Sequence, residues 1–175
     1  MGSFEVNTLS HTMIRVDVST GVPFDDFRSR FEHAAPAFDA QPFEQIIGTG
    51  GSWADVQAAV ETMAPHRLMR YATIDTTAMM AVAGHATKAV EYLLGNHVIA
   101  ESMFRHDPRA LLYAPLRVLV FSDAEGDAVF SLDQPSTMFG SLGIDEVTRV
   151  GVGLDDKVAA LLQFLGVHAT FRSPV

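Results

Sequence analysis

The chain of 175 residues contains no cysteine. This absence excludes disulfide bonds, thiolate-bound zinc, iron–sulfur clusters and cysteine nucleophiles within the chain. The N-terminal residues do not combine a basic segment with an apolar run, and no stretch reaches the roughly 18 uncharged apolar residues of a membrane-spanning helix. We therefore expect a protein of the cytoplasm without a membrane partner.

Basic residues are also scarce, since twelve Lys and Arg stand against twenty-one Asp and Glu, for a net charge of −9. The densest basic segment holds only Arg105, His106 and Arg109, interrupted by Asp107. A nucleic-acid surface needs a concentrated basic face, so we expect no nucleic-acid partner. Hydrophobic residues make up 48% of the chain, which is ample for one sizeable core.

Hydrophobic periodicity predicts strands and helices that alternate along one domain. Strands are expected at residues 13–18, 68–74, 90–94, 116–121 and 128–132, the last two as a β-hairpin. Helices are expected from Phe24 to near Pro36, from a Ser52–Asp55 capping pair to Met63, over 97–106, and from Asp155 or Asp156 to Leu165. Residues 79–82 are expected as a short strand or buried loop. The predicted fold is α+β, with a mixed, largely antiparallel sheet and helices packed on it.

The chain divides by pattern into three parts that are expected to form one compact domain. Residues 1–51 form an N-terminal strand–helix extension, residues 52–166 form the core, and residues 167–175 form a tail. The glycine-rich stretch at residues 48–51 follows no clear strand and precedes no Lys-Ser or Lys-Thr pair, so it does not predict a phosphate loop. We expect a linker there, ahead of the next helix.

The segment of residues 95–108 carries the densest set of chemically versatile side chains. On a helix, His97, Glu101 and Arg105 are spaced four residues apart and share one face. His106 lies nine positions after His97, on the opposite face, so the two histidines cannot bind one metal ion from a straight helix. Asn96 is a natural N-cap, and the backbone amides beside it are candidates for receiving an anion.

Two interpretations of this segment remain open. In the first, His97 and Glu101 act as an acid–base pair, or a ligand is bound by Asn96, His97, Glu101 and Arg105 together with Tyr113 from the following loop. In the second, the charged side chains form a solvated ion pair and the two histidines only mark the ends of the helix. The spacing of the residues does not choose between them.

His85 is a separate candidate, because it follows an apolar run that begins at Met79. A histidine in such a context is expected to be buried and hydrogen-bonded, or else to be a haem or metal ligand with Met79 or Met80 as a soft second ligand. His97 and His106 are the other candidates for holding haem or a metal ion. No haem attachment motif exists, since the chain has no cysteine.

Other polar residues give weaker signals. Asp75 and Glu91 are candidates for a pair of carboxylates on neighbouring strands, available for acid–base chemistry. Ser102, Ser122 and Ser136 lie outside any Gly-x-Ser-x-Gly elbow, so we expect no serine hydrolase.

Three short motifs follow one another in the second half of the chain, at Tyr92–Asn96, Ala114–Phe121 and Leu132–Pro135. Together with the order of elements over residues 52–165, they resemble the domain-of-unknown-function family numbered 302. The resemblance implies a small α+β domain that frequently dimerises, and it implies no established activity. Many members of that family have Pro after the Gly-Asn turn, where this chain has His97.

These observations favour a small-molecule-binding domain that forms a homodimer. Its pocket is expected at the sheet end where Asn96 and His97 meet the loop of residues 109–114. The alternatives are an enzyme that uses His97 and Glu101, a protein that holds haem or a metal ion, and a structural or regulatory interaction module.

Overall fold

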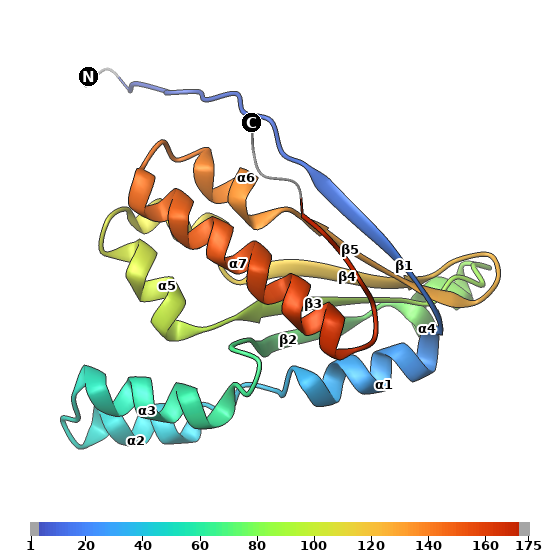
Figure 1. Cartoon of the computed structure of the whole chain (residues 1–175), viewed down its shortest axis with the longest axis horizontal. Helices are drawn as coiled ribbons and strands as arrows, with labels where there is room; N and C mark the ends of the chain where they lie inside the picture. The colour runs from blue at the N-terminus through green and yellow to red at the C-terminus, as the bar shows by residue number, and fades with distance from the viewer. Residues whose placement is uncertain (1–3, 172–175) are drawn as a thin grey trace.

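The computed structural model describes residues 4–171 and is built on a five-stranded sheet (Figure 1). The strand order is β1-β5-β4-β3-β2, and all neighbouring strands in it are antiparallel. The predicted α+β fold with a largely antiparallel sheet is therefore confirmed. In chain order the elements are β1 (Arg15–Pro23), α1 (Phe24–Ala34), α2 (Gln41–Gly48), α3 (Trp53–Met63), β2 (Met69–Asp75), α4 (Thr77–Val82), β3 (Ala89–Gly95), α5 (His97–Phe104), the 3-10 helix η1 (Pro108–Leu112), β4 (Leu116–Ser122), β5 (Asp127–Asp133), α6 (Pro135–Gly140) and α7 (Asp145–Phe164).

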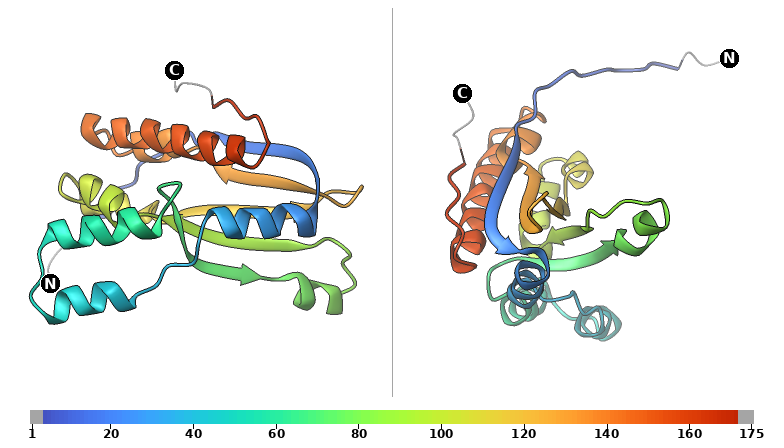
Figure 2. Two further views of the ribbon diagram at one scale, coloured as in Figure 1. Left: turned by 60° about the horizontal axis from the view of Figure 1, so that its bottom comes forward. Right: turned by 90° about the vertical axis from the view of Figure 1, so that its right-hand side faces the viewer.

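The main core lies between the sheet and the helices α1 and α7, which run along the same side of it (Figures 1 and 2). Alternate residues of β3 and β4 point into this core and are buried. From α1, Phe27 and Phe31 are fully buried against the sheet. Because β1 pairs with β5 and α1 packs into the main core, the first part of the N-terminal extension belongs to the same packed body.

A second, smaller hydrophobic cluster lies under the hairpin of α2 and α3, which projects from the main body (Figure 1). Its buried members are Phe43, Val60, Ala64 and Met69. The α3 helix begins at the predicted capping box, in which Ser52 and Asp55 each accept a hydrogen bond from the other's backbone N–H. This cluster borders the candidate functional site.

The predicted start of the last helix is wrong, because α7 begins at Asp145 rather than at Asp155 or Asp156. The preceding residues include Gly151, and glycine lowers the helical propensity of a segment. Packing against α6 explains this glycine, since a Cβ there would lie 3.1 Å from the Cα of Ser136. Asp155 is not a helix cap but is buried within α7, where it accepts a hydrogen bond from the backbone N–H of Ser136 at 3.0 Å.

Two other segments differ from the prediction. Residues 79–82 belong to the short helix α4, in which Met79 and Val82 are exposed, so the expected short strand or buried loop is wrong. Residues 41–48, for which no element was expected, form α2, whose one buried side chain is Phe43. Both segments are short, and neither shows enough turns for its period to be recognised. Among the described helices, none has the length and apolar character that a bilayer crossing requires.

Candidate functional site

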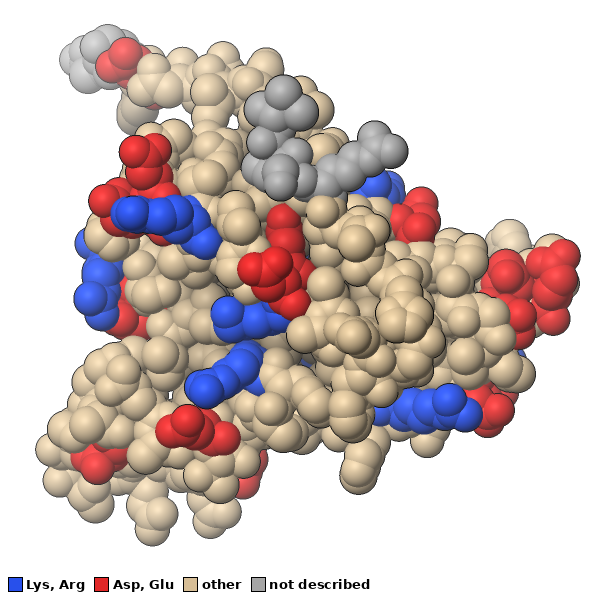
Figure 3. All heavy atoms as spheres, viewed as in Figure 1, with Lys and Arg blue, Asp and Glu red and all other residues tan. Residues whose placement is uncertain are grey.

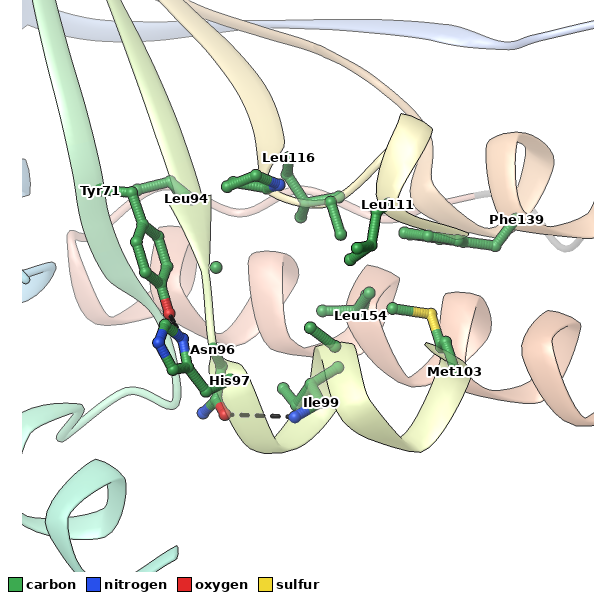
Figure 4. A pocket seen from close by; sticks show the side chains of 14 residues that line it. Tyr71, Leu94, Asn96, His97, Ile99, Met103, Leu111, Leu116, Phe139 and Leu154 are labelled. Atoms are coloured by element: carbon green, nitrogen blue, oxygen red, sulfur yellow. Dashed lines mark hydrogen bonds between the residues drawn. The ribbon is translucent and has the colours of Figure 1, made fainter. Parts of the chain in front are cut away.

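A cavity of about 240 Å³ lies at the sheet end where β3 stops and β4 starts (Figure 4). Tyr71, Asn96 and His97 are the polar residues of its wall, and they lie together at one end. Met103 and Phe139 lie at the other end. The remaining wall is apolar and consists of Leu94, Gly95, Ile99, Ala100, Leu111, Ala114, Pro115, Leu116 and Leu154.

Asn96 is buried and holds the start of α5 in place. Its Oδ1 accepts hydrogen bonds from the backbone N–H groups of Val98 at 2.9 Å and Ile99 at 3.2 Å. Its Nδ2 donates to the carbonyl oxygen of Arg67 at 3.0 Å. The predicted N-cap is therefore present. The two amides that it caps are occupied, so they do not form the anion site expected beside Asn96.

Tyr71 reaches the cavity because β2 contains an irregularity at this residue. In the register of β2 with β3, Arg70 lies opposite Leu94 and Ala72 lies opposite Leu93, which leaves Tyr71 as an extra residue. A β-bulge of this kind redirects a side chain. Gly95 makes room for the ring, since a Cβ at Gly95 would lie only 2.9 Å from Cε2 of Tyr71.

His97 is enclosed by three aromatic rings, those of Phe38, Phe43 and Tyr71, which we call the aromatic cage. The His97 ring stacks on Tyr71 with an interplanar angle of 6°. Its centroid lies 5.1 Å from the ring centroids of Phe38 and Phe43. The Tyr71 hydroxyl makes a hydrogen bond with Nδ1 of His97. The aromatic cage thus fixes the position of the imidazole at the cavity wall.

Burial sets the protonation of the hydrogen-bonded pair. Burial raises the pKa of Tyr71, against the opposing effect of a hydrogen bond from the His97 backbone, and burial lowers the pKa of His97. At neutral pH the phenol is protonated and the imidazole is neutral. A phenol is a better hydrogen-bond donor than acceptor toward an imidazole nitrogen, so we assign Tyr71 as the donor to Nδ1 and the imidazole proton to Nε2. The pair presents one N–H donor in a largely apolar environment.

Part of the aromatic cage comes from the N-terminal extension. Residues 36–38 run beside the start of β2, where the backbone N–H of Arg70 donates to the carbonyl of Pro36 and that of Phe38 donates to the carbonyl of Arg70, both at 2.8 Å. This short parallel contact brings Phe38 over Tyr71, at a centroid distance of 4.7 Å. Sequence reasoning missed all three caging rings, since neither a bulge nor a single bridge leaves a periodic signal.

Three of the predicted ligand-binding residues lie away from the cavity wall. Glu101 and Arg105 form an ion pair along α5, with Arg105 Nε at 3.0 Å from Glu101 Oε1. The hydroxyl of Tyr113 lies 3.2 Å from His11 Nε2 and 3.3 Å from Ser141 Oγ. The hydrogen-bonding partner of His97 is Tyr71 rather than Glu101.

The histidines proposed as metal or haem ligands are not brought together. His85 is exposed in the loop after α4, so the expectation of a buried histidine is wrong. His106 is exposed in a groove between α5 and α7, whereas His97 lies in the aromatic cage. Within residues 4–171, no group of three or more His, Cys, Asp or Glu side chains is arranged to hold a metal ion.

The carboxylates of Asp75 and Glu91 do not pair either. Asp75 accepts a hydrogen bond from Arg28 at 2.6 Å, and Glu91 lies 2.8 Å from Arg117. Their strands are neighbours, but the register places Asp75 opposite Val90. Each carboxylate is therefore neutralised by its own arginine, and the expected acid–base pair is wrong.

Comparisons with known proteins agree on the fold. A family profile described as "Domain of unknown function DUF302" matches residues 50–165. A similar solved structure is the "Crystal structure of uncharacterized conserved protein DUF302 from Bacillus stearothermophilus", with 14% identity, a TM-score of 0.58, and coverage of 86% of this chain and 95% of that chain. At this identity the likeness supports the fold alone. No curated protein matches the chain.

Proposed function

We propose that this chain, which belongs to the DUF302 family, binds a small and largely apolar molecule in the cavity beside α5. The observation that carries the proposal is the cavity of about 240 Å³, which is apolar except for the end formed by Asn96 and the Tyr71–His97 pair. Ligand sites commonly combine an apolar wall with a few placed polar groups. Because the Asn96 side chain is occupied by backbone groups, the Tyr71–His97 pair is the polar anchor.

The volume limits the size of the ligand. An engineered apolar cavity of about 150 Å³ takes up benzene. The cavity beside α5 therefore has room for one aromatic ring with a short substituent, or for a short alkyl chain. We expect a polar atom of the ligand to bind at the caged end, beside the Tyr71–His97 pair.

Binding fits the site better than the acid–base enzyme based on His97 and Glu101. Glu101 pairs with Arg105 and does not line the cavity. Tyr71, which replaces it as the partner of His97, is a weak acid whose pKa is raised by burial. The pair is suited to holding a ligand by a hydrogen bond at neutral pH. No contact among the residues that line the cavity favours the alternative, a structural or regulatory interaction module.

Phenylpropanol is a suitable neutral probe, because it joins one aromatic ring to one hydroxyl group. We expect it to raise the melting temperature of the full chain, as any molecule does that binds only the folded state. Ala100→Leu adds volume at the cavity wall and should abolish this rise while the protein still folds. Ala58→Leu is the matched control, because Ala58 is exposed on α3 and lies away from the cavity.

The proposal fails if phenylpropanol and toluene both leave the melting temperature of the wild-type chain unchanged. It also fails if Ala58→Leu removes the stabilisation as fully as Ala100→Leu does. Circular dichroism of both variants checks that the fold is retained.

We also propose that the functional unit is a homodimer, as the family resemblance implies. Ile74, Glu91 and Leu119 form one row across three strands, on the sheet face away from the main core. Ile74 is 46% exposed and Leu119 is 38% exposed, so apolar surface is available for self-association. Light scattering is expected to give about twice the chain mass of 19.0 kDa, and a monomer mass would refute this part of the proposal.

A further inference from the structure

We infer that the ligand of the cavity carries an anionic group and that Lys157 binds this group in the groove between α5 and α7. The inference rests on the proposed function, because it assigns a charge to the molecule that the cavity holds. It follows from the two residues that the groove and the cavity share, Asn96 and Ile99, and from the contacts of Lys157.

Two open clefts lie beside α5, one of about 460 Å³ toward α7 and one of about 520 Å³ toward α3. Ile99 and Lys157 line both clefts. Ile99 also lines the apolar cavity and is half-buried. Ile99, together with Asn96 on the side toward α3, therefore lies between the cavity and these two clefts, which together we call the α5 groove.

Helical geometry explains this arrangement. On α5, Ala100 and Met103 face the cavity, whereas Ser102 and His106 face the α5 groove, and Ile99 lies between the two directions. On α7, Leu154 faces the cavity and Lys157 faces the groove. The cavity and the groove thus lie on opposite sides of the contact between the two helices. The inference requires that a change in the Ile99 side chain joins the two spaces.

The α5 groove is lined by three cationic side chains and two carboxylates, although the chain as a whole carries a net charge of −9. Figure 3 shows Lys and Arg side chains next to acidic ones over the region between α7, α5 and α3, whereas acidic side chains dominate the turn between β4 and β5. Arg67 and Arg149 line the groove and have local partners, with Arg67 at 3.5 Å from Glu61 and Arg149 at 3.4 Å from Glu146.

Lys157 differs from these two arginines. Its ammonium group donates to the carbonyl oxygen of Gly153 at 3.2 Å. Among residues 4–171, no carboxylate lies within ion-pair distance of it. The side chain is half-buried, and an ammonium group has three donors. It therefore retains donors for an anion, and a charge-assisted hydrogen bond is stronger than a neutral one.

The ligand class that fits both spaces is an amphipathic acid. Its apolar body fills the cavity, and its carboxylate or other anionic head group lies past Ile99 at Lys157. Three probes with the same carbon skeleton test this charge, namely phenylpropionate, phenylpropanol and phenylpropylamine. Calorimetric titration of the full chain at low salt measures their dissociation constants.

Phenylpropionate is expected to bind roughly tenfold more tightly than phenylpropanol, because a hydrogen bond to a charged group contributes more than a neutral one. Phenylpropylamine is expected to bind most weakly. Lys157→Met should weaken phenylpropionate to the level of the alcohol and leave phenylpropanol unchanged. Arg30→Met is the matched control, since it removes the same charge from an exposed site on α1.

The possible outcomes separate the two proposals. If phenylpropanol binds and phenylpropionate shows no preference, the anionic ligand is refuted and the apolar cavity site stands. If Arg30→Met weakens phenylpropionate binding as much as Lys157→Met does, the weakening reflects the net charge of the protein, and the assigned role of Lys157 is refuted. If none of the three probes binds, the proposed function fails and this inference fails with it.

Discussion

The main core and the aromatic cage are built in different ways. The main core takes its side chains from long, regular elements, as when Phe27 and Phe31 project one helical turn apart from α1. The aromatic cage takes its rings from a bulge at Tyr71, an irregular segment at Phe38 and the short helix that carries Phe43. Regular elements stabilise the fold through many similar packing contacts. The aromatic cage instead depends on a few local irregularities of the backbone.

This difference has a consequence for the energetics of the two regions. Residues of the main core come from the sheet and from the helices α1, α5, α6 and α7, so we expect local opening there to disrupt much of the domain. The α2–α3 hairpin rests on a small separate cluster and projects from the body. Regions with few buried apolar contacts open at lower free energy than the core does. We expect the caged end of the cavity to be the adaptable part of the molecule.

The largest expected effect comes from a direct comparison of one ring in each region. Phe31→Ala should lower the free energy of unfolding by about 3–5 kcal/mol, as for other buried phenylalanines. Phe43→Ala should cost about 3 kcal/mol, at the lower end of this range, because the hairpin can collapse around the lost ring. Urea denaturation of both variants measures the two values. Equal losses would show that the cage is as firmly integrated as the core.

A smaller but more specific effect is expected at Gly95. In Gly95→Ala the new methyl group meets the Tyr71 ring at 2.9 Å, so the ring must move away from the position that supports His97. We expect a loss of about 1–3 kcal/mol, typical of overpacking, together with weaker binding of phenylpropanol. Gly140→Ala is the control, since its added methyl meets Thr148 at 3.7 Å, which is ordinary contact. If both variants lose phenylpropanol binding, the loss in Gly95→Ala is not caused by displacement of the Tyr71 ring, and the prediction is wrong.

A third prediction concerns the pH dependence that the aromatic cage imposes. Burial lowers the pKa of His97 below its unfolded value of about 6.5. The folded state therefore binds fewer protons at this site than the unfolded state does. The stability contributed by the neutral imidazole is present above the unfolded pKa and is lost as the pH falls through the folded pKa.

The variant His97→Phe removes this titration while keeping an aromatic ring in the cage. We expect the wild-type chain to lose more stability than the variant between pH 8 and pH 5. NMR titration of the His97 ring measures the folded pKa directly, with the urea-unfolded chain as its reference. A folded pKa at or above that reference would contradict the assignment of a neutral imidazole.

The same difference in construction decides what the sequence can predict. The apolar runs of β3, β4 and β5 and the spacing of Phe27 and Phe31 are clear local signals, and they led to these strands and to the correct first helix. The caps at Ser52 and Asn96 are local signals of comparable clarity. The early part of α7 was missed because Gly151, which tertiary packing against α6 requires, weakens the helical pattern.

The candidate site was predictable only in part. Asn96 and His97 were named from the turn that ends β3, and both lie on the cavity wall. The partners of His97 could not be named, because Tyr71 depends on a bulge and Phe38 on a single parallel bridge. Helical spacing aligned His97 with Glu101, but it does not state which side of a helix faces the cavity, and Glu101 pairs with Arg105.

The smallest expected effect tests that last point on the two sides of α5. Glu101 pairs with the exposed Arg105 and does not line the cavity, whereas Ala100, the residue before it, does. Glu101→Gln removes the acid of the predicted acid–base pair and breaks an exposed ion pair, and such pairs contribute little to stability. We expect no measurable change in melting temperature and no change in the dissociation constant of phenylpropanol. Weaker binding in Glu101→Gln would show that the outer side of α5 contributes to the site, and it would restore Glu101 as the functional partner of His97.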